Sequence, residues 1–403
     1  MEVLGLNAAQ IEAGGAFWTA REIAQQPRLW PEITRPIAAD AGLASFLAPL
    51  LQDPELQVVL TGAGTSSFIG ECLAPALVRQ GRRAEAIAST DIVASPASRL
   101  IPDRLTLMVH FARSGNSPES VAALELAEAR IGRCAHLIVT CNREGELYRR
   151  VGTLRYARAV LLPEEVNDQS FAMTSSFTGM LLAAVVALGV LPADADAATT
   201  ARLAHLGAQM LNSCLPVLDA LVRAQFERVV YLGSSELQGL AREAALKMLE
   251  MTDGRVVSIA ESPLGFRHGP KTVLNGSTLV VVFLSNDQYT RRYDLDLLAE
   301  LRRDAVAGRV LALSARAEVP AEADTLFLGD GEGGDGASGD GAAGASADTL
   351  TDLELCLPYA VFAQSLAMLR SLSLGISPDN PNAAGTVSRV VQGFSIYPCG
   401  GTR

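Results

Sequence analysis

Apolar and polar positions alternate along this chain in two patterns. Short, nearly continuous apolar runs predict buried strands, and longer segments with apolar residues every three or four positions predict helices that cover them. Repeated alternation of the two patterns predicts an α/β fold, with a mostly parallel sheet flanked by helices on both faces. Strands are expected at 56–60, 105–111, 136–140, 158–162, 255–259, 278–284 and 309–313, with 324–328 at an edge.

A short internal repeat divides the chain. The segment VVYLGSSEL at 229–237 echoes VVLTGAGTSSF at 58–68, each a strand followed by a glycine-containing turn. The repeat predicts a duplicated α/β domain. The Gly/Asp-rich stretch 329–348 is typical of a flexible surface insertion without a catalytic role. The expected organisation is a helical N-terminal segment (1–45), a first domain (46–200), a second domain (201–385) that carries the insertion, and a tail (386–403).

Two loops that follow predicted strands have the composition of anion-binding turns. The first, TGAGTSS, places Gly64 and Ser66 between a strand and a helix start, where free backbone N–H groups attract an anion. The G-x-G pattern alone is weak, and Ser67 stands where a dinucleotide fingerprint has its third glycine. The loop therefore indicates a phosphate group and argues against a nicotinamide cofactor.

The second loop, RSGNSPES, supplies Arg113, Ser114 and Ser117. Its structural interpretation is a well-made helix start, with Ser117 as the N-cap and proline in the first helical position. Its functional interpretation is a second phosphate cradle, which is favoured because both loops come between a parallel-type strand and a helix. Thr174, in a later polar segment, either completes this phosphate site or belongs to the cap of the next helix.

A charged row accompanies the apolar stripe of the helix predicted within residues 231–271. Glu243, Lys247 and Glu250 step by four and three along one face, which by itself is typical of a solvated helix edge. A later loop, FRHGPK, holds His268 between residues that restrict the backbone. A carboxylate and a histidine either transfer protons on a sugar or form a structural hydrogen bond. The apolar stripe, which must face a core, consists of Leu237, Leu240, Ala244, Met248 and Met251.

Composition and charge narrow the classes of function. With 49% hydrophobic and 19% charged residues, the 403-residue chain has the composition of a soluble globular protein. Its net charge of −11 argues against a nucleic-acid partner. The start of the chain lacks the cationic and apolar pattern of a secretory signal. The longest apolar stretch, Met180 to Leu191, is too short to cross a membrane and predicts a buried helix.

Cysteine and histidine spacing indicates neither disulfides nor a metal site. The six cysteines are scattered without a C-x-x-C pair, as expected for free thiols in a reducing cytoplasm. The four histidines lie far apart in sequence and show no ligand spacing. No cofactor or metal is therefore expected.

Together these motifs resemble a known family. GAGTSS and RSGNSPES, followed by ALKMLE and FRHGP in the second half, are similar to the motifs of sugar isomerase (SIS) domain proteins. TAREIAQQPRLW near the start and SPDNPNAAGTVSRVVQG near the end resemble the galactosamine-6-phosphate deaminase/isomerase branch, historically described as tagatose-6-phosphate ketose/aldose isomerases. The resemblance implies two tandem SIS domains and a homodimer, or a higher homo-oligomer, whose active sites are shared between subunits.

The resemblance also implies roles for individual residues. Ser66, Ser114 and Ser117 would hold the substrate phosphate, with Thr174 a weaker candidate. Glu250 would be the enolisation base, His268 the ring-opening histidine and Lys247 the active-site lysine. Two positions depart from the family pattern, because Ala112 replaces a serine before the second loop and Gly265 replaces an acidic residue three places before the histidine.

The implied reaction is deaminating isomerisation of an amino-sugar phosphate. The favoured substrate is D-galactosamine 6-phosphate, which would give D-tagatose 6-phosphate and ammonia. Glutamine-dependent synthases of the family use a lysine in the C-terminal tail to hold the ketose as an imine, and this tail has no lysine. This argues against synthesis of the amino sugar and favours the reverse direction, in which the amine departs. The alternatives are an aldose/ketose isomerase that acts on a sugar phosphate without deamination, a glucosamine-6-phosphate deaminase, and a non-catalytic phosphosugar sensor.

Overall fold

The computed structural model describes residues 2–191, 196–319, 324–328, 347–387 and 395–398. The chain forms two compact units, each built around one sheet. The first-sheet unit comprises residues 32–168, 179–196 and 382–403, and the second-sheet unit comprises residues 1–31, 169–178 and 197–381. The units are thus discontinuous in sequence, because residues 1–31 and 169–178 pack with the second sheet. The expected insertion at 329–348 lies outside the described residues except at its last two positions.

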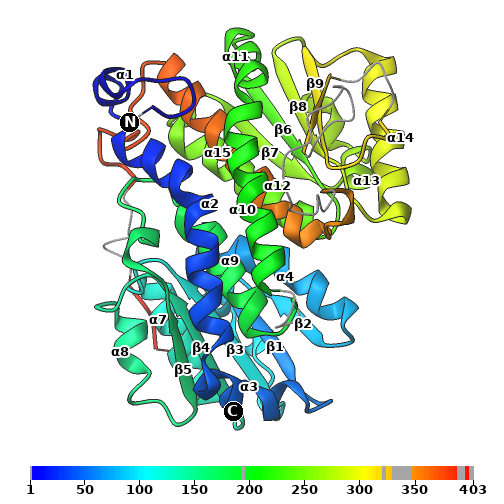
Figure 1. Cartoon of the computed structure of the whole chain (residues 1–403). Helices are drawn as coiled ribbons and strands as arrows, with labels where there is room; N and C mark the ends of the chain where they lie inside the picture. Colours follow the sequence, from blue (N-terminus) through cyan, green and yellow to red (C-terminus); the bar gives the residue numbers. More distant parts are fainter. Residues whose placement is uncertain (1, 192–195, 320–323, 329–346, 388–394, 399–403) are drawn as a thin grey trace. The chain divides into compact units, whose positions relative to one another are not determined.

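The first-sheet unit holds five parallel strands in the order β2-β1-β3-β4-β5 (Figure 1). Both faces are covered, since Leu60 of β1 packs against α4 while Val59 and Met108 pack against α7. This explains why β1 and β3 are buried along their whole length. The elements are α3 (Ala41–Leu51), β1 (Gln57–Thr61), α4 (Thr65–Arg79), β2 (Arg83–Ala86), α5 (Ser89–Ala94), α6 (Pro96–Arg99), β3 (Thr106–Ala112), α7 (Pro118–Arg130), β4 (Cys134–Thr140), α8 (Glu146–Arg150), β5 (Ala157–Leu161) and η1 (Glu164–Val166).

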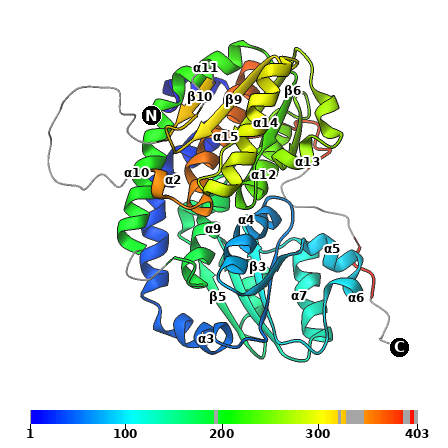
Figure 2. The same ribbon diagram turned by 90° about the vertical axis from the view of Figure 1, so that its right-hand side faces the viewer.

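The second-sheet unit also holds five parallel strands, in the order β10-β9-β8-β6-β7. Figure 2 labels three of them, β10, β9 and β6, together with α14. On one face, Val230 and Val280 pack against Leu297 of α14. On the other face, Tyr231 and Phe283 stack towards Tyr359 of α15. The elements are α1 (Ala8–Ala13), α2 (Phe17–Ala38, which continues beyond this unit), α10 (Asp196–Ser213), α11 (Leu215–Arg223), β6 (Arg228–Leu232), α12 (Glu236–Met251), β7 (Val257–Glu261), α13 (Pro263–Phe266), η2 (Pro270–Val273), β8 (Thr278–Phe283), α14 (Gln288–Asp304), β9 (Arg309–Ser314), β10 (Asp324–Phe327), η3 (Ala347–Thr349) and α15 (Asp352–Ser373).

The two sheets have the same topology, which confirms the predicted α/β fold. Read from β7, the second order is β7-β6-β8-β9-β10, matching β2-β1-β3-β4-β5 strand for strand. The residues before the equivalent helices α4 and α12 share an unusual backbone: Gly64 has φ 56° and ψ −129°, and Ser235 has φ 53° and ψ −122°. Both sheets are wholly parallel within the described residues. The sequence did not reveal β2, because this short edge strand alternates exposed and half-buried residues and has no apolar run.

Two apolar helices belong to the protein interior. The stretch beginning at Met180 forms most of α9 (Ser175–Ala187), where Met180 and Leu181 are fully buried, as predicted. Helix α15 is long and apolar enough to cross a membrane, but 89% of its most apolar window is buried inside the protein. Its composition is therefore that of a core helix.

Candidate active site

The two predicted phosphate loops lie at one edge of the first sheet. Strands β1 and β3 are hydrogen-bonded neighbours, with Thr61 paired to His110, and the order of the strands reverses between them. The loops at 62–64 and 113–117 follow the carboxyl ends of these strands and lead into α4 and α7. Ligands of parallel α/β sheets bind at such a switch point. The structure therefore brings together Gly64 and Ser66 with the Arg113 loop.

The N-cap residues of α4 and α7 have distinct local geometries. Gly64 is the N-cap of α4 in the left-handed region, where glycine is tolerated without strain. Ser117 is the N-cap of α7, as predicted, but its side chain makes no capping hydrogen bond. The Ser117 hydroxyl thus remains available to another partner.

The second loop is braced by the segment after β4, which the sequence analysis did not single out. Asn142 donates from Nδ2 to the carbonyl of Ser114 at 2.8 Å, and Asn116 accepts from the amide of Glu146 at 2.9 Å. A Cβ at Gly145 would lie 2.5 Å from the Ser114 carbonyl oxygen, so only glycine allows this approach. The available signal was an Asn-x-x-Gly turn directly after a predicted strand.

These features together suit a phosphate monoester. Two helices of 15 and 13 residues begin at this edge and present backbone N–H groups. Ser66 and Arg113 are buried beside them, and Ser114 and Ser117 are half-buried. An arginine with hydroxyl and amide donors recognises phosphate oxygens with directional, charge-assisted bonds.

Thr174 lies in the second-sheet unit and is fully buried. Its carbonyl accepts a hydrogen bond of 3.3 Å from Gln364 of α15. The adjoining Ser170 and Ser175 hydroxyls bond to the carboxylate and the carbonyl of Glu22 on α2. The surroundings of Thr174 are those of a segment docked within this unit.

The corresponding switch point of the second sheet is filled by the chain's own carboxylates. After β6, Ser234 donates to Asp294 at 2.6 Å. After β8, Ser285 and the amide of Asn286 donate to Asp352 at 2.5 and 2.7 Å. Hydroxyl and amide groups of the kind that would hold a phosphate thus already donate hydrogen bonds to Asp294 and Asp352. The donors at this edge of the second sheet therefore already have partners within the chain.

Asp294 makes the stability of the fold depend on pH. Burial raises the pKa of Asp294 to about 6, against the lowering effect of the hydrogen bond from Ser234. The folded state therefore binds this proton more tightly than the unfolded chain, whose Asp pKa is about 3.9. Stability from this group is present below about pH 4 and is lost as pH rises through 6, on the order of 2–3 kcal/mol. Chemical denaturation at pH 5 and 7.5 should show a smaller difference for Asp294→Asn than for Asp296→Asn, an exposed control on the same helix.

Two of the three residues in the charged row of α12 are buried, which contradicts the solvated-edge interpretation for Glu243 and Lys247. Lys247 Nζ lies 2.5 Å from Glu250 Oε2 and 3.6 Å from Glu243 Oε1. The side chains of Lys247 and Glu243 are 1% and 2% exposed, whereas that of Glu250 is 27% exposed. The predicted apolar stripe is buried too, because α12 packs against β6, β7 and α15. The helix thus presents one carboxylate, held by a buried ammonium, to its surroundings.

Removing the buried ammonium should destabilise the protein strongly. Lys247→Met is expected to lower the free energy of unfolding by roughly 3 kcal/mol, since it takes the cation away from the buried Glu243 carboxylate. The double variant with Glu243→Gln should recover part of the loss. Urea denaturation of four proteins, namely the parent, each single variant and the double variant, measures both effects. Additive losses would contradict the coupling.

His268 is exposed in a turn between α13 and η2. The residues on either side are anchored to α14, because Arg267 donates to Glu300 at 2.8 Å and Lys271 pairs with Glu300 and Asp304. The hydrogen bonds to Asp304 and Glu300 raise the pKa of Lys271. The loop therefore holds His268 in a defined place, and Lys271 serves as its anchor.

Glu250 and His268 lie on opposite faces of the second sheet. Ser258 of β7 donates to the carbonyl of Ala245 at 2.5 Å, which places α12 on the Tyr231 face. The loop of His268 is tied to α14 on the other face, where Phe266 packs in the core with Leu297. One chain therefore joins Lys247 to Glu250 and does not bring His268 to them.

Comparisons with known proteins agree with this architecture. The SIS domain family matches residues 50–189. A protein of Streptomyces coelicolor is 46% identical over 390 residues, covering 95% of this chain and 96% of that protein. The D-galactosamine-6-phosphate deaminase AgaS of Escherichia coli O157:H7 is 42% identical over 396 residues, covering 97% and 98%. The crystal structure of tagatose-6-phosphate ketose/aldose isomerase from Escherichia coli superposes with a TM-score of 0.84 at 39% identity, covering 95% and 97%.

Proposed function

Because the chain belongs to the SIS-domain family, in its galactosamine-6-phosphate deaminase branch, we propose that it converts D-galactosamine 6-phosphate and water into D-tagatose 6-phosphate and ammonia. The observation that carries the proposal is the partly exposed carboxylate of Glu250, held by the buried ammonium of Lys247. A carboxylate fixed in this way is suited to move a proton between neighbouring carbons of a sugar.

In this proposal the substrate phosphate binds between the loops of Ser66 and of Ser114 and Ser117. The N-termini of α4 and α7 and the guanidinium of Arg113 offset its charge. This local set of donors is needed because the net charge of the whole chain is −11. Phosphate binding thus fixes one end of the open-chain sugar.

The proton transfers follow from the substrate's chemistry. His268 assists ring opening, and Glu250 takes the proton from carbon 2 and returns it to carbon 1. The oxygen on carbon 1 gains the proton that the amine on carbon 2 loses, so the aldehyde becomes a CH2OH group and the amine becomes an imine. Water adds to the imine, and ammonia leaves as the ketose forms. Lys247 acts on the carboxylate and forms no bond to the sugar.

Two copies of the chain supply one active site in this proposal. This is supported by the placement of Glu250 and His268 on opposite faces of the same sheet, since a histidine from a second copy could then meet the carboxylate. We accordingly propose a homodimer, without a nucleic-acid or membrane partner and without a cofactor in the reaction. A cytoplasmic location is supported by the five free cysteines of the described residues.

Nitrogen release decides between the proposed reaction and plain isomerisation. Purified protein is incubated with galactosamine 6-phosphate, glucosamine 6-phosphate and galactose 6-phosphate, and ammonia and ketose are measured. Ammonia and ketose in equal amounts from the first substrate are expected. Ketose from galactose 6-phosphate at a higher rate, or no turnover at all, would overturn the proposal.

Ser117 offers a test of the phosphate site alone. Ser117→Ala should raise the KM for galactosamine 6-phosphate roughly tenfold, the loss of about one charge-assisted hydrogen bond. Since this hydroxyl makes no cap bond, the free energy of unfolding should change by less than the roughly 1 kcal/mol of a lost N-cap. Steady-state kinetics and urea denaturation measure the two quantities; lost stability with an unchanged KM would assign Ser117 to the helix cap.

A further inference from the structure

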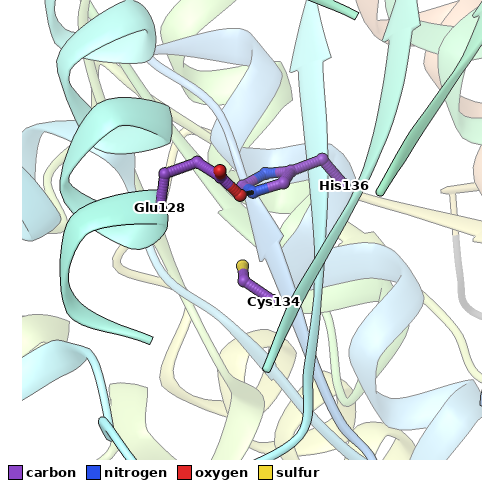
Figure 3. Close-up of side chains that lie close together, drawn as sticks. All are labelled: Glu128, Cys134 and His136. Carbon is purple, nitrogen blue, oxygen red and sulfur yellow. Dashed lines mark hydrogen bonds and ion pairs between the residues drawn. The ribbon is translucent and has the colours of Figure 1, made fainter. Parts of the chain in front are cut away.

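Three side chains with metal-binding atoms meet on the α7 face of the first sheet. Glu128 comes from the last turn of α7, and Cys134 and His136 come from the start of β4. Figure 3 shows the carboxylate of Glu128 against the imidazole of His136, with the thiol of Cys134 directed towards both. The sequence concealed this cluster, because its spacing is not that of a short metal-binding motif.

Strand geometry explains why these residues meet. Residues two apart on a strand point to the same face, so Cys134 and His136 both face α7. Cys134 packs at the border of the core formed with Ala127 and Ile131, so it lies beneath the end of that helix. Glu128 then reaches back over the strand, and its Oε1 lies 2.7 Å from Nε2 of His136.

A second histidine fixes the ring of the first. Nε2 of His110 on β3 lies 3.0 Å from Nδ1 of His136, and the two rings stack with centroids 5.2 Å apart. Both rings are buried, at 1% and 0% exposure. A metal-binding histidine ordinarily donates its second N–H to a fixed acceptor, and Nε2 of His110 is placed to accept it.

We propose that Glu128, Cys134 and His136 form a binding site for a zinc ion, with water as the fourth ligand. Imidazole nitrogen, thiolate sulfur and carboxylate oxygen are the three ligand types that zinc takes in proteins. The three ligand atoms lie within 4.8 Å of one another. Tetrahedral zinc needs them roughly 3.3–3.6 Å apart, so shifts of about 1 Å complete the site. Glu128, with a side chain 32% exposed, has the freedom for this shift and opens the site to solvent.

Binding follows a balanced exchange of protons. Zinc replaces the proton of the Cys134 thiol, which is released to solvent. Without zinc, Nε2 of His136 carries the proton that it donates to Glu128. When zinc binds Nε2, the single proton of His136 stands on Nδ1 and is donated to Nε2 of His110, whose own proton moves to its Nδ1. Both imidazoles stay neutral, so the thiol proton is the one that is released. The Glu128 carboxylate changes its partner from the imidazole to the ion.

The position of the site separates it from the reaction. Cys134 is the first residue of β4 and therefore lies at the amino end of the sheet, whereas the phosphate loops follow the carboxyl ends of β1 and β3. Zinc at this place would fasten the last turn of α7 to β4, so its expected effect is on stability and not on chemistry. Among the described cysteines, Cys134 is the one that is not buried, which leaves it accessible to an ion.

The test uses the full-length chain, treated with EDTA, in a Cys399→Ser background that removes the tail thiol. Zinc affinity is measured by competition with a chromophoric chelator, and cobalt(II) serves as a spectroscopic substitute. We expect one ion per chain, a thiolate-to-cobalt charge-transfer band, and a thermal midpoint that rises with zinc. Ammonia release should be the same with and without the ion.

Two variants and a control make the outcome decisive. Cys134→Ser should weaken zinc binding roughly tenfold or more and abolish the charge-transfer band. Glu128→Gln should weaken binding similarly, and it keeps the test valid if the serine variant fails to fold. Glu125→Gln, on the same helix but paired with Arg150, should bind like the parent. Binding that is less than stoichiometric, or equal in the parent and both ligand variants, would overturn the proposal.

Discussion

Glu250→Gln is expected to lower kcat for ammonia release by roughly 10²–10⁴, with little change in KM. Glutamine keeps the size and the hydrogen-bonding oxygen of the side chain but cannot accept a proton from carbon 2. Because Glu250 is 27% exposed and lies at the end of α12, the fold should tolerate the change. Ammonia release measured at saturating galactosamine 6-phosphate gives kcat directly.

The matched control is Asp253→Asn, three residues further along and exposed. Asp253 has φ 48°, a conformation that asparagine adopts as readily as aspartate. This control should keep the parent activity and stability. Full activity of Glu250→Gln would remove the carboxylate from the mechanism, and equal losses in both variants would indicate a general effect of lost charge.

A mixture of two inactive variants should recover activity. If each site combines Glu250 of one copy with His268 of another, a dimer of one Glu250→Gln and one His268→Ala chain contains one intact site and one doubly altered site. Random mixing makes about half of the dimers mixed, so about a quarter of the parent activity should return. Each variant alone should show a loss of roughly 10²–10⁴.

The mixing experiment needs subunit exchange, so the two chains are coexpressed with different tags and the doubly tagged dimers are isolated. Such dimers should reach about half of the parent activity per dimer. The control dimer pairs a Glu250→Gln chain with an Asp253→Asn chain. One of its two sites keeps the carboxylate whether or not sites are shared, so it should show about half of the parent activity. No recovery in the doubly tagged Glu250→Gln/His268→Ala dimers would place both groups of a site in one chain.

Local patterns in the sequence were enough to predict most of the strands and the two hydroxyl-bearing loops. Apolar runs and turn residues predicted the central strands, and the loops with Ser66 and Ser117 were identified from neighbouring residues alone. These features are local, because a strand, a glycine turn and a helix N-cap depend on residues a few positions apart. The duplicated fold followed from the same patterns.

Tertiary structure decided which polar residues of the helices are buried and which face of the sheet each helix covers. Helical spacing predicted the stripe with Leu237 and Met248, but the burial of Glu243 and Lys247 depends on packing with α15, more than a hundred residues away in sequence. The separation of Glu250 from His268 depends on the faces to which α12 and α14 pack, which no spacing encodes.

The sequence by itself thus determined the fold class and the two hydroxyl-bearing loops, since both arise from short-range periodicity and turn chemistry. Only the tertiary structure decided that Asp294 and Asp352 close the duplicate switch point and that Glu128 meets Cys134 and His136. The physical reason is that burial and contact between distant residues follow from how helices pack on a sheet, and one chain's local pattern is compatible with several such packings.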